Sequence, residues 1–154
     1  KICPEVELFL KDHRVAKGRY KFLVLTGPSG MGKTQFVRSL CRTADALLEL
    51  NCAGSSEIDM KDYLRKQHQV VLFDEASPAC VIKHKKLFQC PPCLVTLGQS
   101  ATSMYSYKVW VHQRLFVVCA NGWFEQRRQM TAADSEWLTT NSHVVTVTAP
   151  MWVA

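Results

Sequence analysis

The sequence lacks the features that mark membrane, repetitive and disordered proteins. Its longest uncharged run, residues 87–107, contains glutamine, serine, threonine and two prolines, so it is not a membrane span. Nothing resembles a signal peptide, an internal repeat, a linker or a low-complexity tract. Hydrophobic residues make up 47% and charged residues 21%, as in ordinary globular proteins. With 154 residues, we expect one domain spanning 1–154 that buries its own core.

Acidic residues are the scarcer charge, with 13 Asp and Glu against 19 Lys and Arg. The net charge of +6 suits a polyanionic partner, although a mildly basic protein without one is equally ordinary. The seven cysteines are an odd number at scattered positions, several within apolar runs. This pattern favours reduced, buried cysteines over a disulfide framework. We therefore expect an intracellular, reducing location, nuclear or cytoplasmic, and no membrane partner.

Apolar periodicity predicts alternating strands and helices, hence an α/β fold with a mostly parallel sheet. The expected strands are 20–26, 46–50, 69–73, 115–120 and 144–148. We expect helices over 5–10, 33–42, 58–66 and 134–138, and a hairpin made from 94–97 and 108–112. The near-continuous apolar runs at 69–73 and 115–120 are typical of strands in a sheet that is covered on both faces.

A glycine-rich segment after the first expected strand fits G-x-x-x-x-G-K-[ST] at every fixed position. Glycines let backbone N–H groups turn inward around phosphates, and the following helix N-terminus adds positive potential. Lys33 would reach the β- and γ-phosphates, and the Thr34 hydroxyl would bind Mg²⁺. The alternative is a flexible turn. The strand–loop–helix context favours a nucleotide site made of Gly27, Pro28, Ser29, Gly30, Met31, Gly32, Lys33 and Thr34.

Polar side chains follow two of the buried strands. Asp74 and Glu75 come after 69–73, and Asn121 comes after 115–120. Ligands of open α/β sheets bind at the carboxyl ends of strands. Asp74 would hold Mg²⁺, Glu75 would deprotonate the attacking water, and Asn121 would contact the γ-phosphate and that water. The alternatives are solvated acids at a strand end and a simple Asn-Gly turn.

Taken together, these three motifs resemble the A, B and C motifs of superfamily 3 helicases, which are compact AAA+ ATPases. The segment from residue 97 through residue 121 is similar to the B′ and C region of that family. Residues 136–142, 144–147 and 150–152 resemble the end of the ATPase domain in geminivirus-like Rep proteins, the replication initiators of circular single-stranded DNA elements. Many Rep proteins have two aspartates in motif B, where this chain has Asp74-Glu75. The resemblance covers nearly the whole chain.

The resemblance implies a P-loop NTPase fold whose five strands are ordered 5-1-4-3-2, with helices flanking the sheet and a B′ hairpin. It implies ATP and Mg²⁺ as cofactors and a ring, usually a hexamer, that moves on single-stranded DNA from 3′ to 5′. An arginine of one subunit would complete the next subunit's site, and Arg127 and Arg128 are the candidates; the alternative is a solvated basic helix end. We expect residues 1–17 to be a helical lead-in. The hexameric ring is expected of the full-length protein, and a monomer of this piece of chain alone.

Basic residues supply the candidate DNA contacts. Family B′ segments place a basic hairpin in the ring pore, and Lys108 and His112 match that region. The run Lys83, Lys85 and Lys86 is a second candidate, and its alternative is a solvated face. Two Y-x-x-K matches, 63–66 and 105–108, resemble the nicking motif of Rep nucleases, but the chain has no His-x-His pair. We therefore expect the nicking nuclease to be absent from this chain.

Two further possibilities remain open from the sequence. Cys80, His84, Cys90 and Cys93 could bind zinc, although their spacing is unusual and incidental cysteines are the stronger interpretation. The function that the motifs favour is an ATP-hydrolysing DNA helicase or translocase domain. The alternatives are another P-loop phosphotransferase such as a nucleotide kinase, or a domesticated, non-catalytic ATP-binding assembly module.

Overall fold

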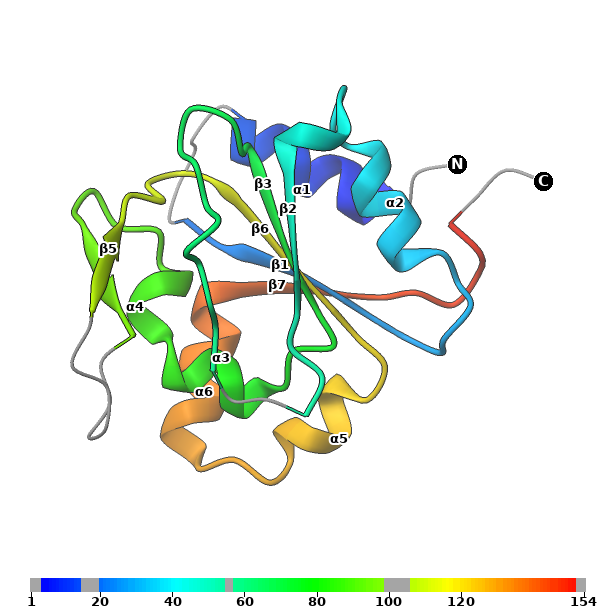
Figure 1. Cartoon of the computed structure of the whole chain (residues 1–154). Helices are drawn as coiled ribbons and strands as arrows, with labels where there is room; N and C mark the ends of the chain where they lie inside the picture. Colours follow the sequence, from blue (N-terminus) through cyan, green and yellow to red (C-terminus); the bar gives the residue numbers. More distant parts are fainter. Residues whose placement is uncertain (1–3, 15–19, 55–56, 99–105, 152–154) are drawn as a thin grey trace.

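A five-stranded parallel sheet forms the centre of the protein, for which we analysed a computed structural model (Figure 1). The structure describes residues 4–14, 20–54, 57–98 and 106–151. Every neighbouring pair in the sheet is parallel. The strands are β1 (Phe22–Thr26), β2 (Leu47–Asn51), β3 (Val70–Asp74), β6 (Leu115–Ala120) and β7 (Ser142–Thr146). The expectation of an α/β fold with a parallel sheet is confirmed.

Across the sheet the strands run β2-β3-β6-β1-β7. These labels also count β4 (Val95–Leu97) and β5 (Tyr107–Val109), which form a separate antiparallel pair. If the five sheet strands alone are numbered in chain order, the sheet read from β7 is 5-1-4-3-2. The β1 and β6 strands, whose loops carry the glycine-rich segment and Asn121, are therefore neighbours in the centre.

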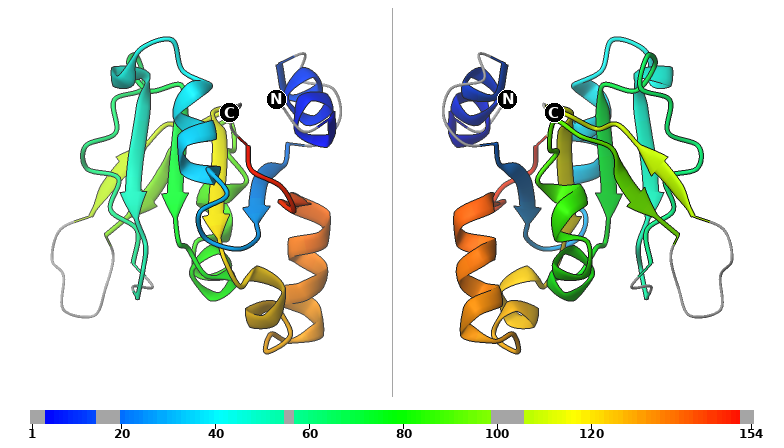
Figure 2. Two further views of the ribbon diagram at one scale, coloured as in Figure 1. Left: turned by 90° about the vertical axis from the view of Figure 1, so that its right-hand side faces the viewer. Right: turned by 90° about the vertical axis from the view of Figure 1, so that its left-hand side faces the viewer.

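Both faces of the sheet are covered, and alternate residues of each strand enter two separate cores. Leu23 and Leu25 of β1 pack with apolar residues of α1 (Pro4–Arg14) and α2 (Lys33–Ser39). Phe22 and Val24 point to the other core. That core is built with the hairpin and with α3 (Pro78–Lys83), α4 (Lys85–Phe88), α5 (Trp123–Arg127) and α6 (Ala132–Asn141). Figure 2 shows α1 and α6 on opposite sides of β1.

Most expected elements are present with shifted ends. The hairpin is confirmed as β4 and β5, helix α2 ends at Ser39 instead of residue 42, and the last strand begins two residues early. Within the expected lead-in, α1 is helical, and residues 1–3 and 15–17 lie outside the described part. So do residues 99–105 of the expected B′ segment, the last of which begins the second Y-x-x-K match, and residue 152. The short 3-10 helix η1 (Ala44–Ala46) and helices α3, α4 and α5 were not expected.

The helix predicted over 58–66 is wrong, because this segment forms turns. Asp59 Oδ1 accepts the Lys61 N–H at 2.9 Å, and His68 Nδ1 accepts the Leu64 N–H at 2.9 Å. Such side chain–backbone hydrogen bonds compete with the helical ladder. The apolar side chains that suggested a helical face, among them Met60 and Tyr63, are instead buried in the core from an irregular backbone. No helix among the described residues has the length and apolar character that a membrane crossing requires.

Candidate functional site

The glycine-rich segment connects the end of β1 to the start of α2. The Gly27 N–H donates to the Ala120 carbonyl at 3.3 Å, which holds the segment against the end of β6. A Cβ at Gly27 would lie 2.5 Å from the Val147 carbonyl oxygen, so the close approach of two backbones requires glycine there. Gly30 and Gly32 have φ of 82° and 78°. The loop is therefore shaped by backbone constraints that a side chain would break.

Lys33, the first residue of α2, is buried beneath this loop with 7% exposure. Its ammonium donates to the carbonyls of Gly27 at 2.9 Å and Pro28 at 2.8 Å. It also donates to Asn121 Oδ1 at 3.1 Å. An ammonium has three N–H donors, so these bonds use all of them. Lys33 thus joins the glycine loop to the polar residue that follows β6.

The acidic pair lies at the carboxyl end of β3, which is the strand next to β6 in the sheet. Asp74 is half-buried and stands in register with Cys119. Glu75 has φ of 57°, the left-handed region that costs a non-glycine residue roughly 1–3 kcal/mol. Its N–H donates to the Cys119 carbonyl at 2.7 Å. This bond to the neighbouring strand sustains the conformation, and the Glu75 side chain remains exposed.

These residues line one cavity of about 260 Å³. Its lining brings together the glycine loop, Lys33, Thr34, both acids and Asn121, which the sequence placed in three separate motifs. Gly27 and Pro28 contribute through the carbonyls that bind Lys33. Sequence reasoning missed two lining residues, Gln35 and Cys119. Only their positions in the sequence could have indicated them, since Gln35 follows Thr34 and Cys119 lies two residues before Asn121.

Cys119 lines the cavity at a buried position that lies near the negative charge of Asp74. Its thiol is buried, and burial raises its pKa to about 12, with a further upward contribution from the Asp74 carboxylate and a downward one from Lys33. The thiol is therefore protonated at neutral pH. It supplies a small uncharged wall beside the Asp74 carboxylate.

The donor set fits a magnesium–phosphate ligand better than a metal bound by protein alone. Thr34 and Asp74 both line the cavity, and hydroxyl and carboxylate oxygens suit Mg²⁺. Within the described ranges, no cluster of three or more His, Cys, Asp or Glu side chains could hold a metal ion. Mg²⁺ is commonly held by one or two protein oxygens together with substrate phosphates and water. The residues present match that pattern.

The zinc hypothesis for Cys80, His84, Cys90 and Cys93 is wrong, because these side chains do not form a metal cluster. The Cys90 thiol donates to the Arg114 carbonyl at 3.8 Å, whereas His84 Nδ1 lies 2.8 Å from the Cys80 carbonyl. Cys93 is exposed.

Arg127 and Arg128, the candidate fingers, lie at the end of α5 and do not line the cavity. The Arg127 guanidinium is tied to α6, since Nε donates to Ser135 Oγ at 3.2 Å and Nη2 to the Ser135 carbonyl at 2.7 Å. It also bonds the Thr139 hydroxyl. Arg128 is exposed. A contact with a neighbouring subunit would be easier for Arg128 than for Arg127.

Several basic residues proposed to bind DNA have acidic partners within the chain. Lys83 pairs with Glu57, and Lys85 Nζ lies 3.2 Å from Asp134 Oδ1. Lys86 on α4 and Lys108 on β5 are exposed. The remaining candidate, His112, is half-buried, with Nδ1 3.2 Å from the Cys90 carbonyl.

Comparison with known proteins supports the fold and no family. No family model matches the chain, and no curated protein matches it. Among the solved structures that match is the A-form apo structure of the C-terminal region of NrS-1, with a TM-score of 0.50 and 12% sequence identity. The alignment covers 87% of this chain and 31% of that one, so the chain spans about a third of its length. At this identity the likeness concerns the fold alone, and the resemblance to Rep helicases stays a prediction.

Proposed function

We propose that this chain is the ATP-hydrolysing motor domain of a Rep-type replication initiator, acting on single-stranded DNA. One observation carries the proposal: a single cavity is lined by residues 29–34 of the glycine loop and helix start together with Asp74, Glu75 and Asn121. The sequence order of these motifs and the strand order β2-β3-β6-β1-β7 support it further. The proposal retains a P-loop NTPase fold of the AAA+ type as its structural basis.

In this proposal the loop and Lys33 bind the nucleotide phosphates. Lys33 already points beneath the loop, and exchange of a carbonyl or of Asn121 for a phosphate oxygen would keep its three donors satisfied. Thr34 and Asp74 would hold Mg²⁺, which neutralises charge on the β- and γ-phosphates when bound. A cavity of about 260 Å³ accommodates the phosphate end of a nucleotide rather than all of it.

Glu75 and Asn121 would act on the attacking water. Glu75 is exposed and lines the cavity, and its backbone is held by the hydrogen bond to the Cys119 carbonyl, so its carboxylate can accept the proton of a water without strand movement. The Asn121 amide is hydrogen-bonded to Lys33, and it would bind the γ-phosphate that Lys33 contacts. The same proposal includes a hexameric ring. In it a neighbouring subunit would supply an arginine to this cavity, either Arg128 or Arg127 after release from α6.

The test is ATP hydrolysis by the purified chain in Mg²⁺, with and without single-stranded DNA. Lys33→Ala should lower the rate by roughly 10²–10³-fold, since it removes a charge aimed at the phosphates. Lys66→Ala, which changes an exposed lysine, is the matched control and should retain the rate. Circular dichroism establishes that both variants are folded.

Two other outcomes would replace the proposal. Transfer of phosphate to an added nucleoside monophosphate would indicate a nucleotide kinase. ATP binding without hydrolysis or transfer, with any DNA tested, would indicate a non-catalytic assembly module. A hydrolysis rate that survives Lys33→Ala would assign the activity to another site or to a contaminant.

A further inference from the structure

Strand β2 is the outermost strand at one side of the sheet, and one of its edges faces away from β3. The Ala46 carbonyl accepts the Gln69 N–H at 2.8 Å, and the Cys52 N–H donates to the Asp74 carbonyl at 2.8 Å. Successive residues of a strand direct their backbone groups to opposite sides, so the even-numbered residues of β2 bond to β3. The N–H and C=O groups of residues 47, 49 and 51 therefore lie on the outer edge. No strand of the described ranges pairs with that edge.

This outer edge lacks the features that commonly keep a sheet edge from pairing. The strand reads Leu-Leu-Glu-Leu-Asn and contains neither proline nor lysine. It is also regular, since all five residues stand in register with β3. Natural edges are often protected by prolines, lysines or bulges. An open and regular edge is what the addition of an extended peptide as a further strand requires.

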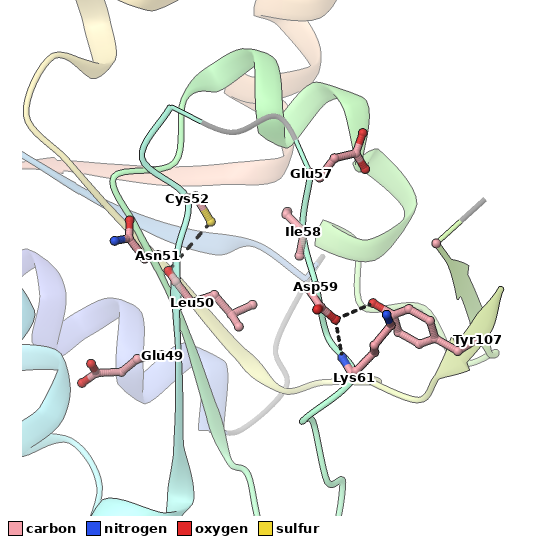
Figure 3. Close-up of a pocket in the computed structure, with 10 residues that line it drawn as sticks. Glu49, Leu50, Asn51, Cys52, Glu57, Ile58, Asp59, Lys61 and Tyr107 are labelled. Atoms are coloured by element: carbon pink, nitrogen blue, oxygen red, sulfur yellow. Dashed lines mark hydrogen bonds between the residues drawn. The ribbon is translucent and has the colours of Figure 1, made fainter. Parts of the chain in front are cut away.

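A cavity of about 500 Å³ beside β2 provides room for side chains of such a peptide. Figure 3 shows Leu50 and Cys52 pointing toward the segment that carries Ile58, whereas Glu49 and Asn51 point away from it. The volume falls within the roughly 300–1,000 Å³ of pockets that hold ligands. Because side chains alternate along a strand, every second residue of an added strand would enter this cavity.

The lining of the cavity indicates which side chains fit. One part is apolar, formed by the half-buried Leu50 and the buried Ile58. Beside Ile58, Asp59 accepts the Lys61 N–H at 2.9 Å and the Tyr107 hydroxyl at 3.4 Å, as the dashed lines in Figure 3 mark. Within the described ranges, no basic side chain forms an ion pair with Asp59. A carboxylate placed in this way favours a Lys or Arg of the ligand.

The other charges of the lining agree with a basic ligand. Glu49 and Glu57 line the cavity together with Asp59, against the single ammonium of Lys61. Glu49 and Glu57 are each paired with a basic residue outside the lining, in pairs that are partly exposed. The phosphates of a nucleic acid would meet these carboxylates, so this cavity disfavours nucleic acid and favours a basic peptide.

We propose that the outer edge of β2 binds an extended, basic peptide segment of a partner protein by strand addition. The segment carries a Lys or Arg two residues away from an apolar side chain, so that both enter the cavity. The apolar side chain packs against Leu50 and Ile58, and the basic one binds Asp59. Backbone hydrogen bonds to residues 47, 49 and 51 supply affinity, and the two side chains supply specificity. The site needs no nucleotide, so its test succeeds or fails separately from ATP hydrolysis.

The probe is the fluorescent peptide Thr-Val-Thr-Lys-Thr-Val-Thr, which presents valine, lysine and valine on one face of a strand. Anisotropy measures its binding to the whole chain, and NMR measures amide hydrogen exchange. The Glu49 and Asn51 N–H groups should exchange more slowly with bound peptide, by about tenfold or more, because they gain hydrogen bonds. The Leu48 and Leu50 amides, which face β3, should exchange slowly with and without it. Of two peptides that are N-methylated at alternate residues, the one whose methyl groups face β2 should not bind.

Two pairs of variants separate the edge from the cavity. Glu49→Pro removes an N–H of the outer edge but no hydrogen bond to β3, and it should abolish binding. Glu49→Ala loses the same ion pair with Arg38 but keeps the N–H, so it is the matched control and should still bind. Asp59→Asn keeps an oxygen for the Lys61 N–H but loses the charge, and should weaken binding by about tenfold. Asp62→Asn, at an exposed acid outside the lining, should not.

The proposal fails if the peptide does not bind, or binds without protecting Glu49 and Asn51. It also fails if both methylated peptides bind equally, or if an analogue with glutamate in place of lysine binds better. Sedimentation that shows a dimer, with Glu49 and Asn51 protected before any peptide is added, would assign the edge to a second copy of the chain instead. Because Glu49→Pro can disturb folding, the exchange rates of the unaltered chain decide the outcome.

Discussion

The cavity at the glycine loop and the basic surface, which consists of Lys83, Lys85, Lys86 and Lys108, differ in how their residues are held. At the cavity, Lys33 and Asn121 contact each other although 88 positions separate them. On the basic surface, Lys83 and Lys85 are paired with acids of the same chain, and Lys86 and Lys108 extend into solvent. The first set is organised by strand ends and shares one cavity. The second set is not held together by one structural element. Because two of its lysines are paired with acids, DNA binding would depend mainly on Lys86 and Lys108, which are fewer residues than the sequence suggested.

This difference has a topological cause. Parallel strands all end at the same sheet edge, so polar residues after β3 and β6 must lie near the loop after β1. A lysine on a short helix has no such constraint, because it can pair with whatever acid the fold brings close. Glu57, which precedes a turn segment, and Asp134, on α6, are examples that a sequence pattern does not reveal.

The largest effect that tests the cavity is expected from Glu75→Gln. The amide keeps the size of the side chain but cannot accept the proton of the attacking water, so hydrolysis should fall by roughly 10²–10⁴-fold. ATP binding, measured with a fluorescent analogue, should be retained because the loop and Lys33 are unchanged. Glu125→Gln on α5, another exposed glutamate, should leave the rate unchanged. Equal rates for the two variants would remove Glu75 from the catalytic set.

A second test concerns the backbone of the loop. At Gly27 a new Cβ would meet the Val147 carbonyl oxygen at 2.5 Å, and overpacking of this kind costs about 1–3 kcal/mol. We expect Gly27→Ala to lower the free energy of unfolding by that amount in urea titrations and to weaken ATP binding. Gly122→Ala, where no atom lies within 4 Å of the new Cβ and φ is −121°, should be much milder. Similar costs for both would mean that the loop is not clamped at Gly27.

The sequence predicted the cavity well because its motifs are local and the sheet joins them. To place the site residues together, only the strand positions were needed, with the rule that parallel strands end at the same sheet edge. This applies to residues 27–34, Asp74, Glu75 and Asn121. The sequence prediction failed at 58–66, where Asp59 and His68 bind backbone groups and stop a helix that apolar spacing suggested. It also grouped Cys80 and His84 with Cys90 and Cys93, whereas in the fold the Cys90 thiol donates to the Arg114 carbonyl and Cys93 is exposed. Long-range side-chain pairing of that kind leaves no periodic signal.

The exposed lysines provide a smaller effect. If Lys108 and Lys86 contact DNA phosphates, Lys108→Gln and Lys86→Gln should each weaken binding of single-stranded DNA without regard to sequence. Each should also lower the slope of log affinity against log salt by about 1. Fluorescence anisotropy over a salt series measures both quantities. An unchanged slope in both variants would exclude these residues from the DNA contact.

The smallest effect is expected at the lysines that the chain already pairs. Lys85 contacts Asp134 and lies 5.7 Å from the centroid of the Trp137 ring, and both partners are partly buried. Lys85→Met keeps the aliphatic stem but removes both charge contacts, so it should cost about 0.5–1 kcal/mol of stability. Lys83→Met, which breaks an exposed pair with Glu57, should leave the midpoint of thermal unfolding unchanged. Because both ammonium groups are neutralised within the chain, neither substitution should alter the salt slope of DNA binding, in contrast to Lys86→Gln. A clear change of slope at Lys83 or Lys85 would show that these pairs open on DNA, and would bring the whole basic run back into the interface.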